Sequence, residues 1–260
     1  MKDGLKRNSM SHKKLKWTMF VITAVGNFIA MLDSTTVNLA LYPMARDLHV
    51  TMGQIQWVMI AYMLILTVFL PFFGKLGDIF SKNKLYTVGF LLFGIGAFLN
   101  TTAPTFELLI AYRCLEALGA SILLSNGQAI IASIFKKERR GKALGLNGCI
   151  VAIGGMSGPA LGGILINYFG WHSVFFPCVI VAILGVIYSY RMLPRSVKTD
   201  IKNFKFDYRG FFYFTVSLFA LLLAISEGHT WGWNSLKIIV LGIITLIFGA
   251  LFYMRDHKIN

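Results

Sequence analysis

Charged residues are scarce in this chain of 260 residues. Asp, Glu, Lys and Arg together make up 14% of the sequence, whereas about a quarter of an ordinary soluble domain is charged. Hydrophobic residues make up 56%. This balance excludes an ordinary soluble domain and predicts a protein that is embedded in lipid.

Catalytic and metal-binding signatures are missing as well. The sequence has no HExxH, no GxSxG and no Walker loop, which are patterns of zinc proteases, serine hydrolases and nucleotide-binding proteins. The three cysteines, Cys114, Cys149 and Cys178, lie in apolar segments without metal-like spacing, so we interpret them as packing residues. The sequence therefore predicts neither an enzyme nor a metal site.

Long apolar runs are what the chain has in abundance. A helix of about 20 apolar residues can cross the roughly 30 Å hydrocarbon core of a bilayer. Eight runs approach or exceed this length: 17–41, 55–73, 85–103, 106–134, 143–168, 174–193, 211–226 and 236–253. They lack the period-two alternation of barrel strands. We therefore expect an all-α integral membrane protein with eight spans.

The positive charges follow a regular order along the chain. Connecting segments with two to six Lys or Arg residues alternate with segments that have one or none. Because positive charge is enriched in cytoplasmic loops, we expect the rich segments, and with them both termini, to be cytoplasmic. The net charge of +14 then reflects orientation in a membrane, and we expect no nucleic-acid partner.

The connections also indicate how the spans are grouped. Residues 1–16 form a basic N-terminal segment, and the run that follows is too long for a signal peptide, so we interpret it as a retained span. The longest connection is polar and basic and follows the sixth run. We therefore expect a six-helix bundle over residues 17–193, a cytoplasmic linker over 194–210, and two additional spans within 211–260.

A polar turn interrupts the first run. Asp33 is followed closely by Ser34, Thr35, Thr36 and Asn38, and a charged residue at the centre of a span costs about 2.5–3.5 kcal/mol on insertion scales. One interpretation is a residue near the outer end of the span whose side chain reaches water. The other is a carboxylate that lines a cavity and either takes up a proton or faces a cation.

The fourth run contains Arg113, with Glu116 three residues later. Residues at this spacing share one face of a helix, so we expect Glu116 to neutralise Arg113 in part. Such a pair is compatible with a structural role and with a role in coupling transport to a proton.

Several segments resemble motifs of the major facilitator superfamily. GKLGDIFSKNK is similar to the cytoplasmic signature G-x-L-x-D-R-x-G-R-K and matches it at Gly74, Leu76, Asp78 and Lys82. It differs at Ile79, Ser81 and Asn83. The Arg113 segment resembles the fourth-helix motif R-x-x-Q-G-x-G-x-A, with Glu116 in place of Gln. LDSTTVNLALYP, which contains Asp33 and Asn38, resembles the first-helix motif of drug/proton antiporters with about fourteen spans.

The segment GGMSGPALGG resembles the fifth-helix antiporter motif G-x-x-x-G-P-x-x-G-G. It matches at every fixed position: Gly154, Gly158, Pro159, Gly162 and Gly163. Gly154, Gly158 and Gly162 are four residues apart and form a smooth stripe that a neighbouring helix can approach closely. Pro159 can kink the helix. The stripe is compatible with a seam that moves during transport and with a packing contact that has no role in exchange.

The resemblance covers about residues 17–255 and implies a fold and a function. It implies a major facilitator type six-helix bundle built from two three-helix inverted repeats, with the last two spans as an additional pair. It also implies a proton-coupled multidrug or lipophilic-cation efflux transporter in the bacterial cell (inner) membrane. The energy source would be the proton gradient, with no bound cofactor and no metal, and the partners would be the bilayer and a small lipophilic or cationic substrate.

The same resemblance implies roles for particular residues. Proton coupling and the substrate cavity would involve Asp33, Asn38, Arg113 and Glu116. The cytoplasmic gate would involve Gly74, Asp78 and Lys82.

The family also has a second six-helix bundle, which these 260 residues do not contain. The bundle would be completed by a missing second half or by a second copy of the chain. Two alternatives therefore stay open: a solute or metabolite transporter of the same family, and a truncated membrane protein that transports nothing.

Overall fold

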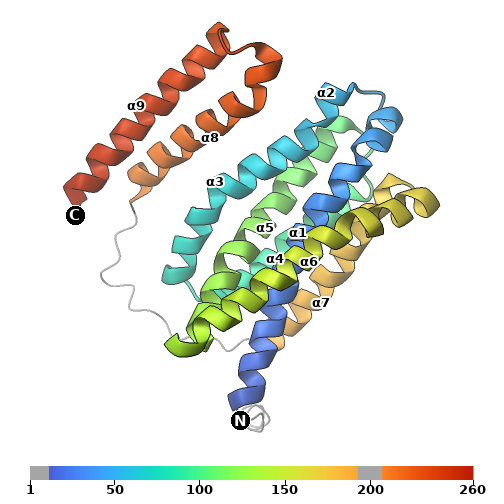
Figure 1. Ribbon diagram of the computed structural model, residues 1–260, viewed down its shortest axis with the longest axis vertical. Coiled ribbons are helices and arrows are strands. Elements are labelled where there is room, and N and C mark those ends of the chain that lie inside the picture. The colour runs from blue at the N-terminus through green and yellow to red at the C-terminus, as the bar shows by residue number, and fades with distance from the viewer. Residues whose placement is uncertain (1–11, 193–206, 260) are drawn as a thin grey trace.

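The computed structural model describes residues 12–192 and 207–259, and the regular elements in these ranges are all helical. The elements are α1 (His12–Asp47), α2 (Met52–Ile55), α3 (Trp57–Ile79), α4 (Lys82–Asn100), α5 (Phe106–Ile134), α6 (Lys137–Phe169), η2 (Trp171–Phe175), α7 (Phe176–Met192), α8 (Tyr208–Trp231) and α9 (Leu236–Ile259). Figure 1 shows α1 to α7 as one bundle with the α8–α9 hairpin beside it. The expected all-α architecture is confirmed, while residues 1–11 and most of the expected linker lie outside the described residues.

Seven helical segments in the described ranges are long and apolar enough to cross a bilayer. The remaining expected span, 85–103, corresponds to α4, which is not among the seven. The reason lies in its ends: this helix of 19 residues begins with Lys82, Asn83 and Lys84 and ends at Asn100, so its apolar part is short.

Two helices extend beyond the expected runs. α1 has 36 residues and a length of about 54 Å, well over the roughly 30 Å of hydrocarbon, because the helix continues into polar flanks on both sides of the apolar run. α8 begins at Tyr208, inside the expected linker. The Asp207 side chain accepts a hydrogen bond from the Gly210 backbone N–H at 3.0 Å and so starts the helix early.

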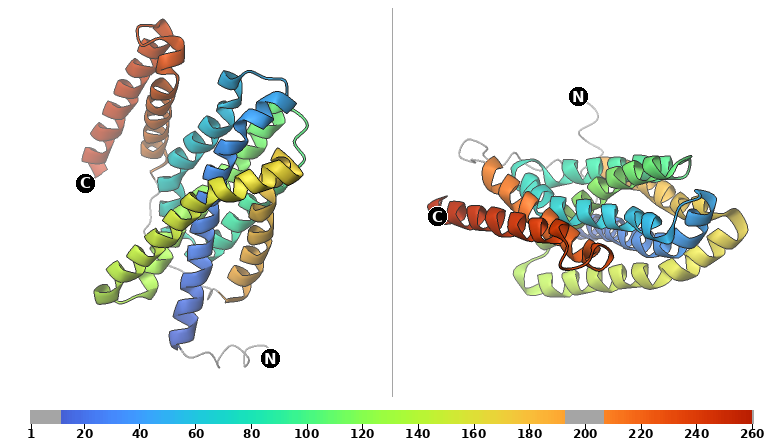
Figure 2. Two further views of the ribbon diagram at one scale, coloured as in Figure 1. Left: turned by 45° about the vertical axis from the view of Figure 1, so that its right-hand side comes forward. Right: turned by 90° about the horizontal axis from the view of Figure 1, so that it is seen from above.

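The core of the bundle forms around α1, which packs against α5, α6 and α7. Figure 2 shows α1 crossed obliquely by α6 on one face. Tyr86 and Phe90 of α4 are fully buried beside α1, and the Tyr86 hydroxyl donates to the Thr23 carbonyl at 2.9 Å. The outer surface is apolar too: Met156, for example, is 80% exposed. A surface of this kind suits contact with lipid.

Glycine brings α4 and α5 unusually close together. A Cβ at Gly96 would lie 2.6 Å from the backbone nitrogen of Glu116, and a Cβ at Gly119 would overlap the backbone of Phe93. Only glycine fits at such approaches. The contact places Asn100, one turn after Gly96, beside Glu116.

The α8–α9 hairpin is held by contacts of its own. The Ser217 hydroxyl of α8 donates to the Thr245 carbonyl of α9 at 3.0 Å. At the other end of the hairpin, Arg255 Nε donates to both carboxylate oxygens of Asp207, at 2.7 and 2.9 Å. α8 also lies against α3, where the rings of Phe72 and Phe211 are 4.6 Å apart.

Candidate functional site

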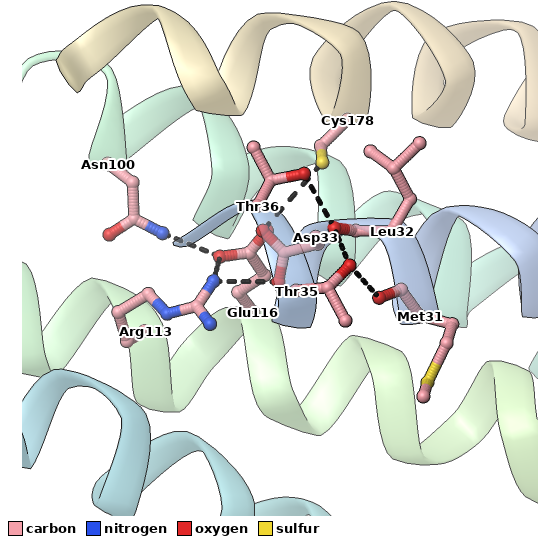
Figure 3. A network of polar contacts seen from close by, with 9 residues as sticks. All are labelled: Met31, Leu32, Asp33, Thr35, Thr36, Asn100, Arg113, Glu116 and Cys178. Carbon is pink, nitrogen blue, oxygen red and sulfur yellow. Dashed lines mark hydrogen bonds and ion pairs between the residues drawn. The ribbon is translucent and has the colours of Figure 1, made fainter. Parts of the chain in front are cut away.

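A buried ion cluster lies inside the bundle, between α1 and α5. Arg113 Nη1 donates to Asp33 Oδ2 at 2.8 Å and to Glu116 Oε2 at 2.7 Å, and the three side chains have no solvent exposure. Figure 3 shows the guanidinium directed at both carboxylates. The pairing of Arg113 with Glu116 that the sequence predicts is confirmed, and Asp33 joins it from 80 residues away.

Three further helices and η2 surround this cluster. Asn100 of α4 donates from Nδ2 to Glu116 Oε2 at 2.7 Å, and Cys178 of α7 lies with its Sγ 3.8 Å from Asp33 Oδ1. Arg113 Cζ lies 4.1 Å from the ring centre of Tyr62 of α3 and 5.7 Å from that of Phe175. Cation–π contact is strongest when the cation is removed from water, as it is here. The cluster therefore joins most of the bundle at one point.

Several buried polar atoms of the cluster have no hydrogen-bond partner among the described residues. They are Arg113 Nε and Nη2, Glu116 Oε1, Asn100 Oδ1 and the hydroxyl of Tyr62. A buried donor or acceptor left unpaired costs about 1–3 kcal/mol, more for a charged group. The cluster thus has hydrogen-bonding capacity beyond what the described chain uses.

The charges of the cluster do not balance. One guanidinium faces two carboxylates, so one added proton makes the set neutral. The oxygens of Asp33 and Glu116 and the sulfur of Cys178 also lie within 4.8 Å of one another, close enough to share a metal ion. However, the Arg113 guanidinium bonds to both carboxylates, so a metal ion would have to displace a cation that is already there.

Asn38 does not join the cluster. It is exposed on the surface of α1, whereas Asp33 is fully buried. Helical geometry explains the difference, because five residues correspond to a rotation of about 140° around the axis. Thr36, three residues after Asp33, lies nearer to the same face and is buried.

The glycine stripe of α6 packs against the part of α1 that carries Asp33. A Cβ at Gly154 would lie 2.7 Å from the Phe28 carbonyl oxygen, one at Gly158 would overlap the Thr35 side chain, and one at Gly162 would lie 2.9 Å from Thr36 Cγ2. The other two positions of the motif, Gly163 and Pro159, are less confined: a Cβ at Gly163 would lie 3.7 Å from Leu39, and Pro159 is exposed. α6 continues through Pro159 as one helix.

Two threonines at this contact bond to the backbone of their own helix. The Thr35 hydroxyl lies 3.2 Å from the Met31 carbonyl and 3.0 Å from the Leu32 carbonyl. The Thr36 hydroxyl donates to the same Leu32 carbonyl at 2.7 Å and lies 3.4 Å from the Gly158 carbonyl of α6. The polar turn in the first apolar run is thus directed at backbone carbonyls and at α6.

The expected gate residues lie together where α3 meets α4. Lys82 Nζ pairs with Asp78 Oδ1 at 2.7 Å, and the Asp78 side chain is 61% exposed. A Cβ at Gly74 would make an ordinary contact with Ser125 of α5 at 3.8 Å. Asn126 fixes this end of α3 by donating to the Phe73 carbonyl at 3.0 Å. The gate segment is therefore anchored to α5 while its ion pair faces outward.

Sequence reasoning missed Asn100 and Tyr62, and it interpreted Cys178 only as a packing residue. Asn100 carries a weak signal, since a polar residue near the end of an apolar run calls for a partner. Tyr62 and Cys178 carry none, because their neighbours come from other helices. A second polar pair was missed in the same way: Asn27 of α1 donates to Asn147 of α6 at 3.1 Å inside the bundle.

Comparison with known proteins agrees with this architecture. Residues 23–254 match the family described as Major Facilitator Superfamily. The chain is 40% identical over 246 residues to the riboflavin transporter RibZ of Clostridioides difficile (strain 630), covering 94% of this chain and 52% of that protein. It is 30% identical over 244 residues to multidrug resistance protein 3 of Bacillus subtilis (strain 168), covering 93% of this chain and 47% of that protein.

The fold is similar to that of a peptide transporter, POT, crystallised in complex with sulfate. The TM-score is 0.67 at 16% identity, over 93% of this chain and 52% of the other. The chain spans about half the length of the curated relatives that it matches. The family match covers most of the described helices, and this multi-pass membrane protein belongs to the major facilitator superfamily.

Proposed function

We propose that the chain forms the N-terminal portion of a proton-coupled exporter of the drug/proton antiporter type in a bacterial cell membrane. The observation that carries the proposal is the buried cluster in which Arg113 serves two carboxylates, Asp33 and Glu116. Ionisable groups inside a membrane bundle are costly and are typical of proton and ion pathways.

The charge of the cluster suggests how it couples to a proton. With both carboxylates ionised the set carries one net negative charge, and one proton removes it. Asp33 takes up a proton when the cavity is open to the outside and releases it on the inside, while Arg113 and Glu116 alter its affinity as exposure changes. A lipophilic cation competes for the same carboxylate, so that proton entry drives cation exit.

In this proposal, the movement that accompanies transport takes place at the contact between α1 and α6. At the glycine stripe α6 presents no side chain to α1, so at this contact α6 can shift against the segment that carries Asp33. Asp78 and Lys82 act as a latch on the cytoplasmic side of the outward-open state. Their partner surface would lie in a second bundle, supplied by a second half or by a second copy.

A second candidate function is transport of riboflavin or a similar solute. The observation that favours it is the 40% identity to a riboflavin transporter over 94% of this chain, against 30% to a multidrug resistance protein. The unpartnered donors of Arg113 and Tyr62, together with unpartnered acceptors in the same cluster, suit a substrate that has both donors and acceptors better than a simple cation. The buried cluster would then couple the proton to a different cargo.

The two candidates are separated by one transport assay. A full-length transporter that contains this sequence is reconstituted in liposomes with an imposed pH gradient, and uptake of ethidium and of riboflavin is measured in parallel. Saturable, ionophore-sensitive ethidium transport supports the exporter. Riboflavin transport without ethidium transport supports the second candidate, and transport of either substrate that ignores the pH gradient contradicts proton coupling.

A further inference from the structure

A groove of about 870 Å³ opens between the start of α1, the end of α5 and the start of α6. Figure 1 shows these segments together at the end of the bundle that holds the N-terminus. The groove has two kinds of lining. Four cations line it: Lys16, Lys136, Arg139 and Lys142. The other lining residues are apolar or aromatic: Trp17, Phe20, Ile134, Phe135, Ala143 and Leu146.

The four cations converge without an anion to balance them. All four are exposed, and none forms an ion pair within residues 12–192 and 207–259. Bringing like charges together is unfavourable unless an anion joins them. The first backbone N–H groups of α6 also carry partial positive charge, which Glu138 in the first turn offsets in part; Glu138 does not line the groove.

The position of each residue around the axis of α6 decides which cations line the groove. Arg139, Lys142 and Leu146 share one face of the helix, whereas Lys137 and Arg140 point away from it and do not line the groove. The same two turns of helix thus carry cations inside and outside the groove, which provides matched positions for an experiment.

Three aromatic rings mark the boundary between the charged and apolar parts of the groove. Trp17, Phe20 and Phe135 pack edge to face, with ring centres 5.6 to 6.0 Å apart. Tryptophan is enriched at the level of lipid headgroups. Along α1 the lining passes from Lys16 to Phe20, and along α6 it passes from Arg139 and Lys142 to Leu146, so both helices follow the polarity sequence of a phospholipid.

A neighbouring cavity shows that this lining is specific to one groove. The second cavity, of about 880 Å³, lies on the other side of Trp17 between α1, α4 and α7. It has a similar volume and begins at the same end of α1, but Lys14 is the single charged residue in its lining. Interfacial position alone therefore does not produce a basic groove.

We propose that the basic groove binds one anionic phospholipid, with its phosphate among the four cations and an acyl chain against Phe135 and Leu146. Positive segments lie at the membrane face that is expected to be cytoplasmic, and the cytoplasmic leaflet carries the anionic lipid. The proposal does not depend on the transported substrate or on proton coupling.

The test compares two variants of equal charge. Arg139→Gln with Lys142→Gln removes two cations from the groove, and Arg140→Gln with Lys137→Gln removes two from the outer face of the same helix. The purified chain is transferred to nanodiscs of phosphatidylcholine with a minority of phosphatidylglycerol, and retained lipid is measured by native mass spectrometry. Quenching of Trp17 by brominated phosphatidylglycerol, with Trp17→Phe as reference, reports lipid at this end of α1. Because Trp17 lines both cavities, loss of the quenching in the groove variant alone is the result that assigns the lipid to the basic groove.

We expect the unmodified chain to retain one phosphatidylglycerol. Its affinity should fall about thirtyfold in the groove variant, which corresponds to about 1 kcal/mol for each cation, and at most a few-fold in the outer variant. Equal losses in both variants, or no loss in either, would overturn the proposal. Two other results would also overturn it. If soluble glycerol phosphate stabilised the chain as much as phosphatidylglycerol does, the groove would be assigned to a soluble anion. If the unmodified chain formed a dimer and the groove variant did not, the groove would be assigned to a second copy of the chain.

Discussion

Gly158 of α6 lies so close to Thr35 of α1 that a Cβ at residue 158 would overlap the threonine side chain. That Cβ would also lie 3.1 Å from the backbone nitrogen of Thr36, so a rotation of the Thr35 side chain alone would not make enough room for it. This contact joins the glycine motif of α6 to the turn that carries Asp33, and it can be tested directly.

Gly158→Ala should destabilise the bundle by about 1–3 kcal/mol, the usual cost of overpacking. Gly148→Ala is the matched control on the same helix, since nothing lies within 4 Å of a Cβ there. Because alanine is a better helix former than glycine, the control should be neutral or stabilising by up to about 1 kcal/mol. Unfolding in mixed micelles of dodecyl maltoside and SDS measures both. Equal stability of the two variants would show that α1 and α6 are not in the close contact described.

Removing Arg113 should be far more damaging than removing an exposed arginine. Arg113→Met leaves two buried carboxylates without their cation, which costs about 3–5 kcal/mol when a buried pair is broken. Arg46→Met, in the last turn of α1, should change stability by less than about 0.5 kcal/mol. Arg113→Lys should recover only part of the loss, because a lysine lacks the planar fork. A stable Arg113→Met variant would contradict the described ion cluster.

Asp33→Asn should abolish transport driven by a pH gradient in an assembled, full-length transporter, because an amide cannot cycle a proton. Insertion into the membrane should be unaffected, since an uncharged residue is cheaper to insert. Asn38→Ala is the comparison on the same helix and should keep the dependence on the pH gradient even if substrate affinity changes, because Asn38 does not titrate and lies outside the ion cluster. Undiminished transport by Asp33→Asn, or loss of the dependence on the pH gradient in Asn38→Ala alone, would move the coupling site away from Asp33.

The first turn of α8 should respond to acid. The Gly210 backbone N–H, followed by the Arg255 guanidinium, holds the pKa of Asp207 below its usual value. A group with a lowered pKa stabilises the folded state above its unfolded pKa of about 3.9, and this contribution is lost as pH falls through the folded pKa. Hydrogen exchange, corrected for the intrinsic rate, should therefore show less protection at Gly210 below about pH 4.

Asp207→Asn provides the reference for this measurement. Asparagine can still cap the helix but does not titrate, so protection at Gly210 should not change with pH over the same range. Loss of protection at the same pH in both proteins would assign the effect to another group.

Orientation in the membrane can be checked with single cysteines in a background without native cysteines. Pro104→Cys lies in the exposed turn between α4 and α5 and should react with an impermeant thiol reagent added to whole cells. Glu138→Cys lies at the opposite end, at the start of α6, and should react only after the cells are opened. The reverse pattern would invert the expected topology.

The 260-residue chain alone is expected to show no proton-coupled efflux of ethidium from liposomes, because it supplies one wall of a cavity that the family builds from two bundles. Saturable, ionophore-sensitive efflux by the purified chain would instead favour a homodimer. Crosslinking between copies at Gly158 or Asp33 would then be the measurement to make.

Much of the fold follows from the sequence, because lipid rewards long apolar helices and the runs mark them directly. Helix ends were less accurate: α1 continues to Asp47 and α8 begins at Tyr208, since polar flanks and caps extend a helix beyond its apolar part. α4 was found as a run, although the polar residues at its ends keep it out of the seven helical segments that are long and apolar enough to cross a bilayer.

The candidate site was only partly predictable. The pairing of Arg113 with Glu116 follows from spacing on one helix, whereas its link to Asp33 depends on how α1 lies against α5. Asn100 reaches the cluster because Gly96 lets α4 approach α5, which one sequence does not reveal. The exposed position of Asn38 could have been derived, because five residues on a helix point to a different face.

The Leu32 carbonyl of α1 is shared among competing donors. It accepts from the Thr35 and Thr36 hydroxyls, at 3.0 and 2.7 Å, in addition to its place in the helical ladder. An oxygen with two lone pairs cannot hold three strong bonds, and hydroxyls that bond back to the preceding turn bend helices. The ladder of α1 is thus weakened at the turn that bears Asp33, although neither a proline nor a glycine lies there. A small change of curvature at this turn would tilt the carboxylate relative to Arg113, so the flexibility of the backbone and the geometry of the ion cluster are set by the same few atoms.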